Sequence, residues 1–185
     1  MHITRLDQIT PNLTEIYTTN EFQELFVGFQ FPEKLKTLLL HNYRQCLIGV
    51  KFSDSLEILH LHNYSQCLVG VQFPKTLKEL YLGNCTMSLV GVKFPEVLQK
   101  LNLTEHSMSL IGVQFPQTLK ELNLSYQSMS VIDVEFPHEI TIIINYLIDD
   151  PKFEFIKNIK HNVHNVYYYT YLKYPRDHFI KPCLN

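Results

Sequence analysis

Three histidines at regular spacing are the residues of this chain that most suggest chemistry. His60 and His62 are two positions apart, and His41 precedes His62 by 21 positions. In an extended strand, side chains two positions apart face the same side, so these imidazoles would meet there. Imidazoles bind zinc and titrate near neutral pH, but no carboxylate stands at matching positions to orient them. We therefore expect a solvated histidine patch and no metal site.

Two cysteines share the same spacing. Cys46 and Cys67 are also 21 positions apart, while four cysteines in the whole chain are too few and too irregular for a disulfide framework. The corresponding later positions hold Ser88, Ser109 and Ser130, so the site accepts a small, partly exposed side chain. We expect free thiols, with a disulfide between Cys46 and Cys67 left open as the alternative.

Signatures of catalysis are absent from the sequence. It contains no glycine-rich phosphate loop, no nucleophile elbow and no zinc-protease helix. We expect no enzyme and no cofactor. A formal net charge of -2 gives no general attraction to nucleic acid or to an anionic membrane. The basic, tyrosine-rich tail over 152–181 could bind single-stranded nucleic acid, but its composition equally suits a cap that buries its rings, which we favour.

The chain is organised by a repeat of 21 residues. The segment from Gly91 to Leu103 has near copies that begin at Gly70 and Gly112. A glycine, a phenylalanine followed by proline, and a leucine triplet recur together in each copy. The Phe-Pro positions keep the 21-residue interval throughout: Phe31-Pro32, Phe52-Ser53, Phe73-Pro74, Phe94-Pro95, Phe115-Pro116 and Phe136-Pro137.

The leucine triplet predicts a short parallel strand in each repeat. Leu-x-x-Leu-x-Leu, as in Leu98, Leu101 and Leu103, is the central signature of leucine-rich repeats. Its last two leucines face one side of a strand, and the residue between them faces the other side. Stacked coils would pair these strands about 4.8 Å apart and bury the leucines.

The segment that returns the chain is expected to be β-rich. Leu-x-Gly-Val-x-Phe alternates, and its glycine and β-branched residues disfavour a helix, so we expect a second short strand or an extended segment. The glycine is expected to form a bend at which stacked backbones approach closely, and the proline to fix the turn into the leucine strand. The predicted fold is mainly β: a leucine-rich-repeat solenoid of 21-residue coils with a parallel sheet and little helix in the repeats.

The first residues look like a degenerate opening coil. Leu13, Ile16 and Thr18 stand for the leucine triplet, at an interval one residue longer than the others. Terminal repeats of a solenoid are commonly atypical, because its ends need a polar cover. We expect residues 1–30 to form an N-terminal cap with this first repeat, and residues 31–148 to form the regular array.

The C-terminal end departs from the pattern. In the last coil Ile140 and Ile143 are expected in the leucine columns, with Asn145 breaking the pattern. A capping segment is expected over 149–185, with a helix that begins near Pro151 and a strand over 166–172. This segment would cover the exposed edge of the last coil.

The coils resemble leucine-rich repeats over roughly residues 9–148, and more closely FNIP repeats, a short β-rich class that also places proline before Leu-x-x-Leu-x-Leu. Such arrays occur in amoebae and in the large DNA viruses that infect them. The Phe-Asn-x-Pro element itself is replaced, as in Tyr43-Arg-Gln-Cys-Leu47. Some relatives carry an F-box, for which the stretch before the array is too short. The resemblance implies protein binding, with no family-level catalytic residues.

The outward positions of the leucine strands form the predicted binding surface. They vary from coil to coil while the buried positions stay constant, as expected for a common scaffold with an individual face. The predicted partner-binding residues are Leu39, His41, His60, His62, Tyr81, Lys100, Asn102, Thr104 and Asn123.

Three functions follow from these patterns. The first is binding of an unidentified protein through the leucine-strand face; the alternatives are self-association into a structural protein and nucleic-acid binding through the tail. The opening residues lack the basic and apolar regions of a secretory signal. No run approaches the roughly 18 apolar residues that span a bilayer. We therefore expect an intracellular, cytoplasmic location without membrane contact.

Overall fold

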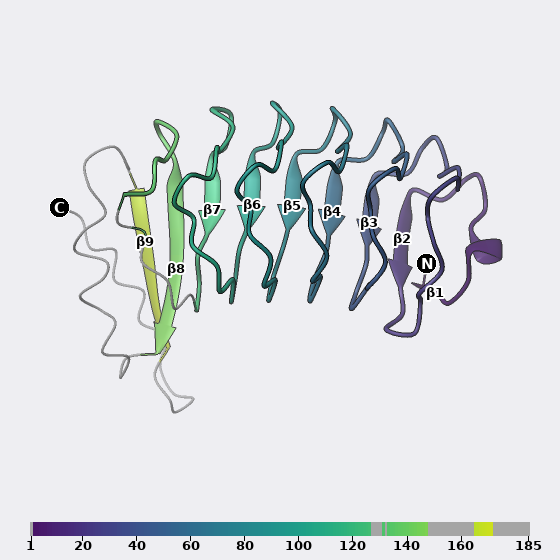
Figure 1. The fold of residues 1–185 in the computed structure, drawn as a ribbon, viewed down its shortest axis with the longest axis horizontal. Coiled ribbons are helices and arrows are strands. Elements are labelled where there is room, and N and C mark those ends of the chain that lie inside the picture. The colour runs from purple at the N-terminus through teal and green to yellow at the C-terminus, as the bar shows by residue number, and fades with distance from the viewer. Residues whose placement is uncertain (1, 127–130, 132, 148–164, 172–185) are drawn as a thin grey trace.

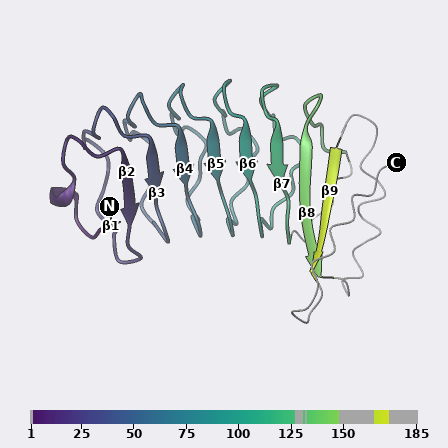
Figure 2. The same cartoon turned by 180° about the vertical axis from the view of Figure 1, so that it is seen from behind.

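The strands in the described part of the chain form one parallel sheet of nine strands in sequence order (Figures 1 and 2). The computed structural model describes residues 2–126, 131, 133–147 and 165–171, the last seven and 145–147 by their backbone alone. A short 3-10 helix at Leu6–Gln8 follows the first strand. The strands are β1 His2–Ile3, β2 Glu15–Thr18, β3 Thr37–Leu39, β4 Ile58–His60, β5 Glu79–Tyr81, β6 Lys100–Asn102, β7 Glu121–Asn123, β8 Thr141–Leu147 and β9 Asn165–Tyr171.

The strands pair in register at the interval that the sequence predicts. Leu38 pairs with Leu59, and Leu59 with Leu80, as each coil places its strand beside the last. These leucines and the one two positions further on, such as Leu40, are fully buried. The hydrophobic effect therefore acts between coils as well as within them, since one coil cannot bury its own leucines. The predicted leucine-rich-repeat solenoid with a parallel sheet is confirmed.

The return segment is built from turns, and no strand is assigned there in the described coils. The amide of Val50 donates to the carbonyl of Leu47 at 3.2 Å, which closes a four-residue turn with Gly49 in its third position at φ +82°. A positive φ at that position defines a type II turn and favours glycine. The predicted bend is correct, but close approach is not the reason for it: a Cβ on Gly49 would meet no atom within 4 Å.

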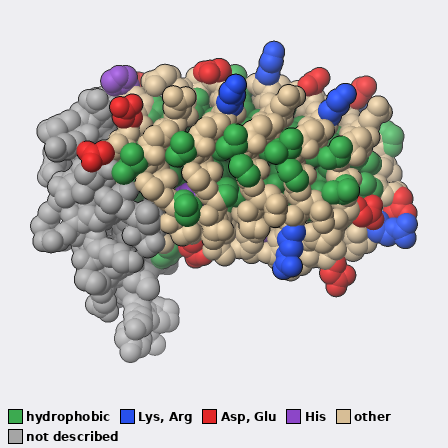
Figure 3. All heavy atoms as spheres, viewed as in Figure 1, with side chains coloured by type: hydrophobic (Ala, Val, Ile, Leu, Met, Phe, Trp, Pro, Cys, Tyr) green, Lys and Arg blue, Asp and Glu red, His purple; other side chains and the backbone are tan. Residues whose placement is uncertain are grey.

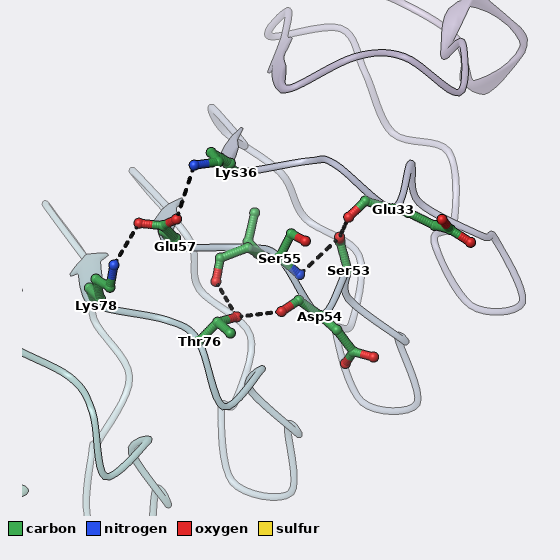
Figure 4. A network of polar contacts seen from close by, with 9 residues as sticks. Glu33, Lys36, Ser53, Asp54, Ser55, Glu57, Thr76 and Lys78 are labelled. Atoms are coloured by element: carbon green, nitrogen blue, oxygen red, sulfur yellow. Dashed lines mark hydrogen bonds and ion pairs between the residues drawn. The ribbon is translucent and has the colours of Figure 1, made fainter.

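A second turn leads each coil into its strand. The amide of Leu77 donates to the carbonyl of Pro74 at 3.1 Å, so the proline opens the turn. Ser53 replaces proline in one coil, and its hydroxyl donates to the carbonyl of Glu33 at 3.2 Å while it accepts from the amide of Ser55 at 3.3 Å (Figure 4). The two hydrogen bonds of Ser53 thus hold this turn in place, as the proline ring does in the other coils.

A ladder of asparagines follows the strands and was not predicted. Asn63 donates from its side-chain amide to Asn42 at 2.6 Å and accepts from Asn84 at 2.6 Å, and Asn42 donates to Asn20 at 3.0 Å. Asn42, Asn63 and Asn84 have φ values of +52°, +58° and +53°. Asparagine tolerates this left-handed region better than most residues, so one residue type serves both the turn and the ladder.

One buried column changes character along the solenoid. Tyr43 and Tyr64 are fully buried, and their hydroxyls donate to the carbonyls of Glu24 and Gln45 at 3.0 and 3.2 Å. The same column then holds Cys85, whose thiol donates to the carbonyl of Leu61, and fully buried His106. Burial lowers the pKa of His106. Burial of this column could not be predicted from the sequence, because its members share no hydrophobic residue type.

The first coil agrees with the prediction and gains a strand. Ile16 pairs with Leu38 and is buried, so the interval here is one residue longer, as expected. The two-residue strand β1 was not predicted; it pairs Ile3 with Thr18 and places a buried isoleucine over the end of the array. Phe22 and Phe26, with ring centroids 5.1 Å apart, fill the interior of this coil.

The last described coil corrects the predicted register. Leu122 pairs with Ile142, not with Ile143, so this coil is one residue shorter. The buried residues are Ile140, Ile142 and Ile144, which alternate as one face of a strand. Ile143 points outward instead, and Asn145 therefore does not stand in the leucine column. The prediction assumed a constant interval, which the Ile-x-Ile-x-Ile alternation overrides.

The predicted strand near the C-terminus is confirmed as β9, which pairs in parallel with β8 from Asn165 to Tyr171. The predicted helix after Pro151 lies outside the described residues, and the division into caps and array stays a prediction. In the described part of the chain, no helix has the length and apolar character that crossing a membrane requires.

Candidate protein-binding face

The outward side of the sheet carries one residue from each strand between the two buried leucines. The pairing sets Leu39 beside His60, His60 beside Tyr81, and Tyr81 beside Asn102. Asn102 in turn lies beside Asn123. All five are half-buried by their neighbours. The column forms a continuous row across five strands.

The centre of this row is a stacked aromatic pair. The ring of His60 lies 3.9 Å from that of Tyr81, centroid to centroid, with 4° between the planes. Burial, followed by repulsion from His41 and His62, lowers the pKa of His60 to about 4, against an opposing effect of Glu79. The ring is therefore neutral at physiological pH, which suits stacking against tyrosine.

Tyr81 is anchored at its other end. Its hydroxyl donates to Glu79 Oε2 at 2.7 Å, and burial together with this bond raises the pKa of Tyr81 to about 12. Glu79 also lies 3.9 Å from the ammonium group of Lys100. The stacked pair is thus held in place by a carboxylate on the same face. A fixed aromatic surface loses little conformational entropy on binding.

His62 occupies space that a glycine leaves open. A Cβ on Gly83 would lie 2.8 Å from His62 Nδ1, far closer than atoms pack. The ring of His62 is 6.2 Å from that of His41 in an edge-on arrangement. Gly83 does not have a positive φ, so glycine is needed here because it has no side chain, not because of its backbone conformation.

The three histidines lie near one another without forming a metal centre. Among the described residues, no group of three or more histidine, cysteine, aspartate or glutamate side chains is arranged to hold a metal ion. The expected histidine patch is therefore an aromatic and polar surface, since the ring of His60 is stacked on Tyr81.

A ladder of charges borders the row. Glu57 lies between two lysines, 2.8 Å from Lys78 Nζ and 3.4 Å from Lys36 Nζ (Figure 4). The hydrogen bond from Lys78 and then that from Lys36 lower the pKa of Glu57. These groups are solvent-exposed, so the ladder contributes little to stability. It fixes alternating charges directly before strands β3, β4 and β5.

The later coils present a more polar surface. Asn102 Oδ1 accepts from the amide of Thr104 at 3.0 Å, and Asn123 Oδ1 accepts from the amide of Ser125 at 2.9 Å. These bonds orient the asparagines, as in Asx turns. Lys100 is exposed beside them. The predicted residues thus divide into an aromatic half and an amide half.

Sequence reasoning missed two members of the row. Tyr17 pairs with Leu39 and extends the row at one end, where its ring lies 5.3 Å from that of His2. Ile143 pairs with Asn123 and extends it at the other end. Aligning the first coil by its longer interval would have identified Tyr17. The shortened last coil concealed Ile143.

A second surface feature lies before the turn glycines. Five β-branched residues at this position are between 42% and 55% exposed. Hydrophobic side chains gather along the length of the solenoid in Figure 3. We call these five residues the apolar stripe: Val27, Ile48, Val69, Val90 and Ile111.

Comparison with known proteins agrees with this architecture. Residues 43–85 match the family model of the FNIP repeat. No curated protein matches the sequence. A solved structure described as CroV588, a novel circular LRR protein, aligns with 91% of this chain at a TM-score of 0.65 and 18% identity. This chain spans 25% of the length of that protein.

The repeat geometry continues beyond the two coils that the family model covers. The 21-residue interval between paired, buried leucines holds from Leu38 to Leu122, on both sides of the matched segment. The chain therefore has a leucine-rich-repeat fold, and its residues 43–85 match the FNIP repeat.

Proposed function

We propose that this protein binds a partner protein through the outward side of its sheet, centred on His60 and Tyr81. The stacked aromatic pair is the observation that carries the proposal. Aromatic residues held in a fixed orientation commonly dominate binding energy at protein interfaces. Solenoids of this kind use their extended strand surfaces for such recognition.

The surroundings of the pair support a protein as the ligand. Glu79 and Lys100 place opposite charges beside the rings, and Leu39 adds an apolar contact. A mixed surface with an aromatic centre and a polar rim matches the composition of specific protein interfaces. A polyanion such as nucleic acid would find no consistent positive potential here, because Glu57 neutralises the adjacent lysines.

Affinity capture with matched variants tests the proposal. Bait proteins would be the wild type, the double variant His60→Ala/Tyr81→Ala, and a control with Lys75→Ala, an exposed residue away from the row. A partner recovered by the wild type and the control should be lost with the double variant. Equal recovery by all three baits would contradict the proposal.

The apolar stripe favours a second candidate, association of two copies of this chain. A contiguous exposed apolar surface is uncommon on a monomer. Val69 and Val90 repeat at the coil spacing, and a second copy has the same spacing, so the side chains of two stripes can interdigitate along their length. An unrelated partner would need to match that period independently.

Sedimentation at increasing concentration tests this candidate. The wild type should approach the mass of a dimer, while Val69→Lys/Val90→Lys should stay monomeric because it places charge in the contact. A wild type that stays monomeric at high concentration would exclude association through the apolar stripe. It would not bear on partner binding through the sheet face.

A further inference from the structure

Cys46 and Cys67 occupy equivalent positions in adjacent coils. Each is exposed and free, and its Sγ lies 3.4 Å from the amide nitrogen two residues further on, that of Ile48 or Val69. Because the two sulfurs make the same contact in their own coils, they are related by one coil-to-coil step. Their side chains point the same way from the same edge of the solenoid.

The distance between neighbouring coils determines whether the two sulfurs can form a disulfide or bind one metal ion between them. It is about 4.8 Å where strands pair, and the stacked rings of Phe31 and Phe52, also one coil apart, are 6.1 Å apart. A disulfide joins cysteines whose Cα atoms are about 4.4–6.8 Å apart, but only where their side chains converge, whereas each sulfur here lies against an amide of its own turn. Two metal–sulfur bonds of about 2.3 Å, arranged in line, span about 4.6 Å. Parallel thiols at this step therefore suit a bridging metal better than a disulfide.

The surroundings of the pair define which cations fit. No third histidine, cysteine, aspartate or glutamate joins the two thiols to make a larger ligand group in the described chain. Zinc requires about four ligands and calcium more. Two sulfur ligands alone suit soft cations, which thiolates select. Tyr64 lies behind the pair, its hydroxyl bonded to the carbonyl of Gln45 and the amide of Leu47 on either side of Cys46.

We propose that Cys46 and Cys67 form a two-thiolate site for a soft monovalent cation of the Cu(I) class. Binding forms two metal–sulfur bonds, releases the two thiol protons to solvent and transfers no electrons. The buried Tyr64 fixes the backbone around Cys46, so the site is organised before the cation arrives.

The chain itself provides conservative controls. Ser88 and Ser109 hold the same position in later coils, and their hydroxyls accept the corresponding amide bond from Val90 and Ile111 at 3.2 Å. Replacing Cys46 or Cys67 by serine therefore preserves the turn. All proteins in the experiment would contain residues 1–185 and carry Cys183→Ser, which removes the thiol of Cys183 as a competing ligand.

Competition titration with Cu(I) and a chromophoric chelator measures the site. The Cys183→Ser protein should bind one equivalent, and Cys46→Ser or Cys67→Ser should each weaken binding by about 100-fold or more, since one of two ligands is lost. Adding Ser88→Cys to Cys46→Ser rebuilds an adjacent pair with Cys67 and should restore binding. Adding Ser88→Cys to Cys67→Ser separates the thiols by two coils and should not.

Several results would overturn the proposal. Binding of one equivalent by either single serine variant with unchanged affinity would show that the pair is not the site. Two independent equivalents would show that each thiol binds alone. No binding beyond that of the Cys46→Ser/Cys67→Ser variant, which retains the buried Cys85, would exclude the site altogether.

Discussion

The imidazole of His60 is stacked on the ring of Tyr81, with the ring centroids 3.9 Å apart and the two planes within 4° of parallel. The two residues stand on neighbouring strands in direct register, so the repeat itself brings them into contact. Tyr81 is held by Glu79 on the same face. Burial of this imidazole outweighs the attraction of Glu79 for its protonated form, and this has a consequence for stability.

Acid should destabilise the protein before its carboxylates titrate. A histidine in the unfolded chain has a pKa of about 6.5, whereas the pKa of His60 in the fold is about 4. Between these values the unfolded chain binds the extra proton, so the free energy of unfolding falls as the pH falls through this window. Solvent screening of a half-buried ring reduces the effect to the order of 1 kcal/mol.

Urea unfolding at pH 7 and at pH 5 would measure this loss. His60→Phe keeps the stacked ring and removes the titration, so it should lose less stability over the same interval. Some acid sensitivity should remain, because burial also lowers the pKa of His106. Equal losses in the wild type and in His60→Phe would show that His60 is not responsible.

Gly83→Ala should displace His62 and leave the fold intact. The added Cβ would lie 2.8 Å from His62 Nδ1, but His62 is exposed and can rotate away. We expect a change in free energy of unfolding below about 1 kcal/mol, as for most changes that an exposed side chain absorbs. The ring resonances of His62 should shift in NMR spectra while those of His106 stay constant. Unchanged His62 resonances would refute the steric relationship.

The asparagine ladder should contribute measurably to stability. Asn63→Ala removes one side-chain bond to Asn42 and one to Asn84 and places alanine at φ +58°. We expect a loss of about 2 kcal/mol, from two hydrogen bonds and backbone strain. Asn63→Gly removes the same bonds without strain and should lose less. Urea unfolding of both variants separates the two effects; equal losses would exclude a role for the backbone.

Substitutions at two equivalent turn positions should change the free energy of unfolding in opposite directions. Gly70 has φ +88°, and Gly70→Ala should destabilise by about 1–2 kcal/mol because alanine is strained there. Asp133 occupies the same column with φ +64°, so Asp133→Gly should relieve strain and stabilise by a few tenths of a kcal/mol to about 1 kcal/mol. Thermal unfolding gives the sign of each change. A destabilising Asp133→Gly would contradict the turn assignment.

Much of the scaffold could be predicted from the sequence because a repeat aligns itself. The leucine columns revealed strand register wherever the interval was constant, and even the longer first interval could be read from Ile16. The interval failed at Ile142, where a missing residue converts Leu-x-x-Leu to Ile-x-Ile. A pattern of period two was present there, but the assumed period of 21 obscured it.

The candidate site could be predicted only in outline. Outward columns follow from strand alternation, so His60 and Tyr81 could be placed side by side in advance. Their stacking could not, because it depends on side-chain torsions and on the bond between Tyr81 and Glu79. The space that Gly83 leaves for His62 could not be predicted either, since the other glycines of the repeat are explained by their positive φ.

Site-specific photo-crosslinking reports which surface of this protein touches a partner in the cell. One protein would carry p-benzoylphenylalanine in place of Tyr81 and a matched protein would carry it in place of Val69 on the apolar stripe. If the sheet face binds the partner, position 81 should crosslink to a different protein and position 69 should not. A crosslink from position 69 with none from position 81 would contradict binding through the sheet face, as would products at position 81 that contain only a second copy of this chain.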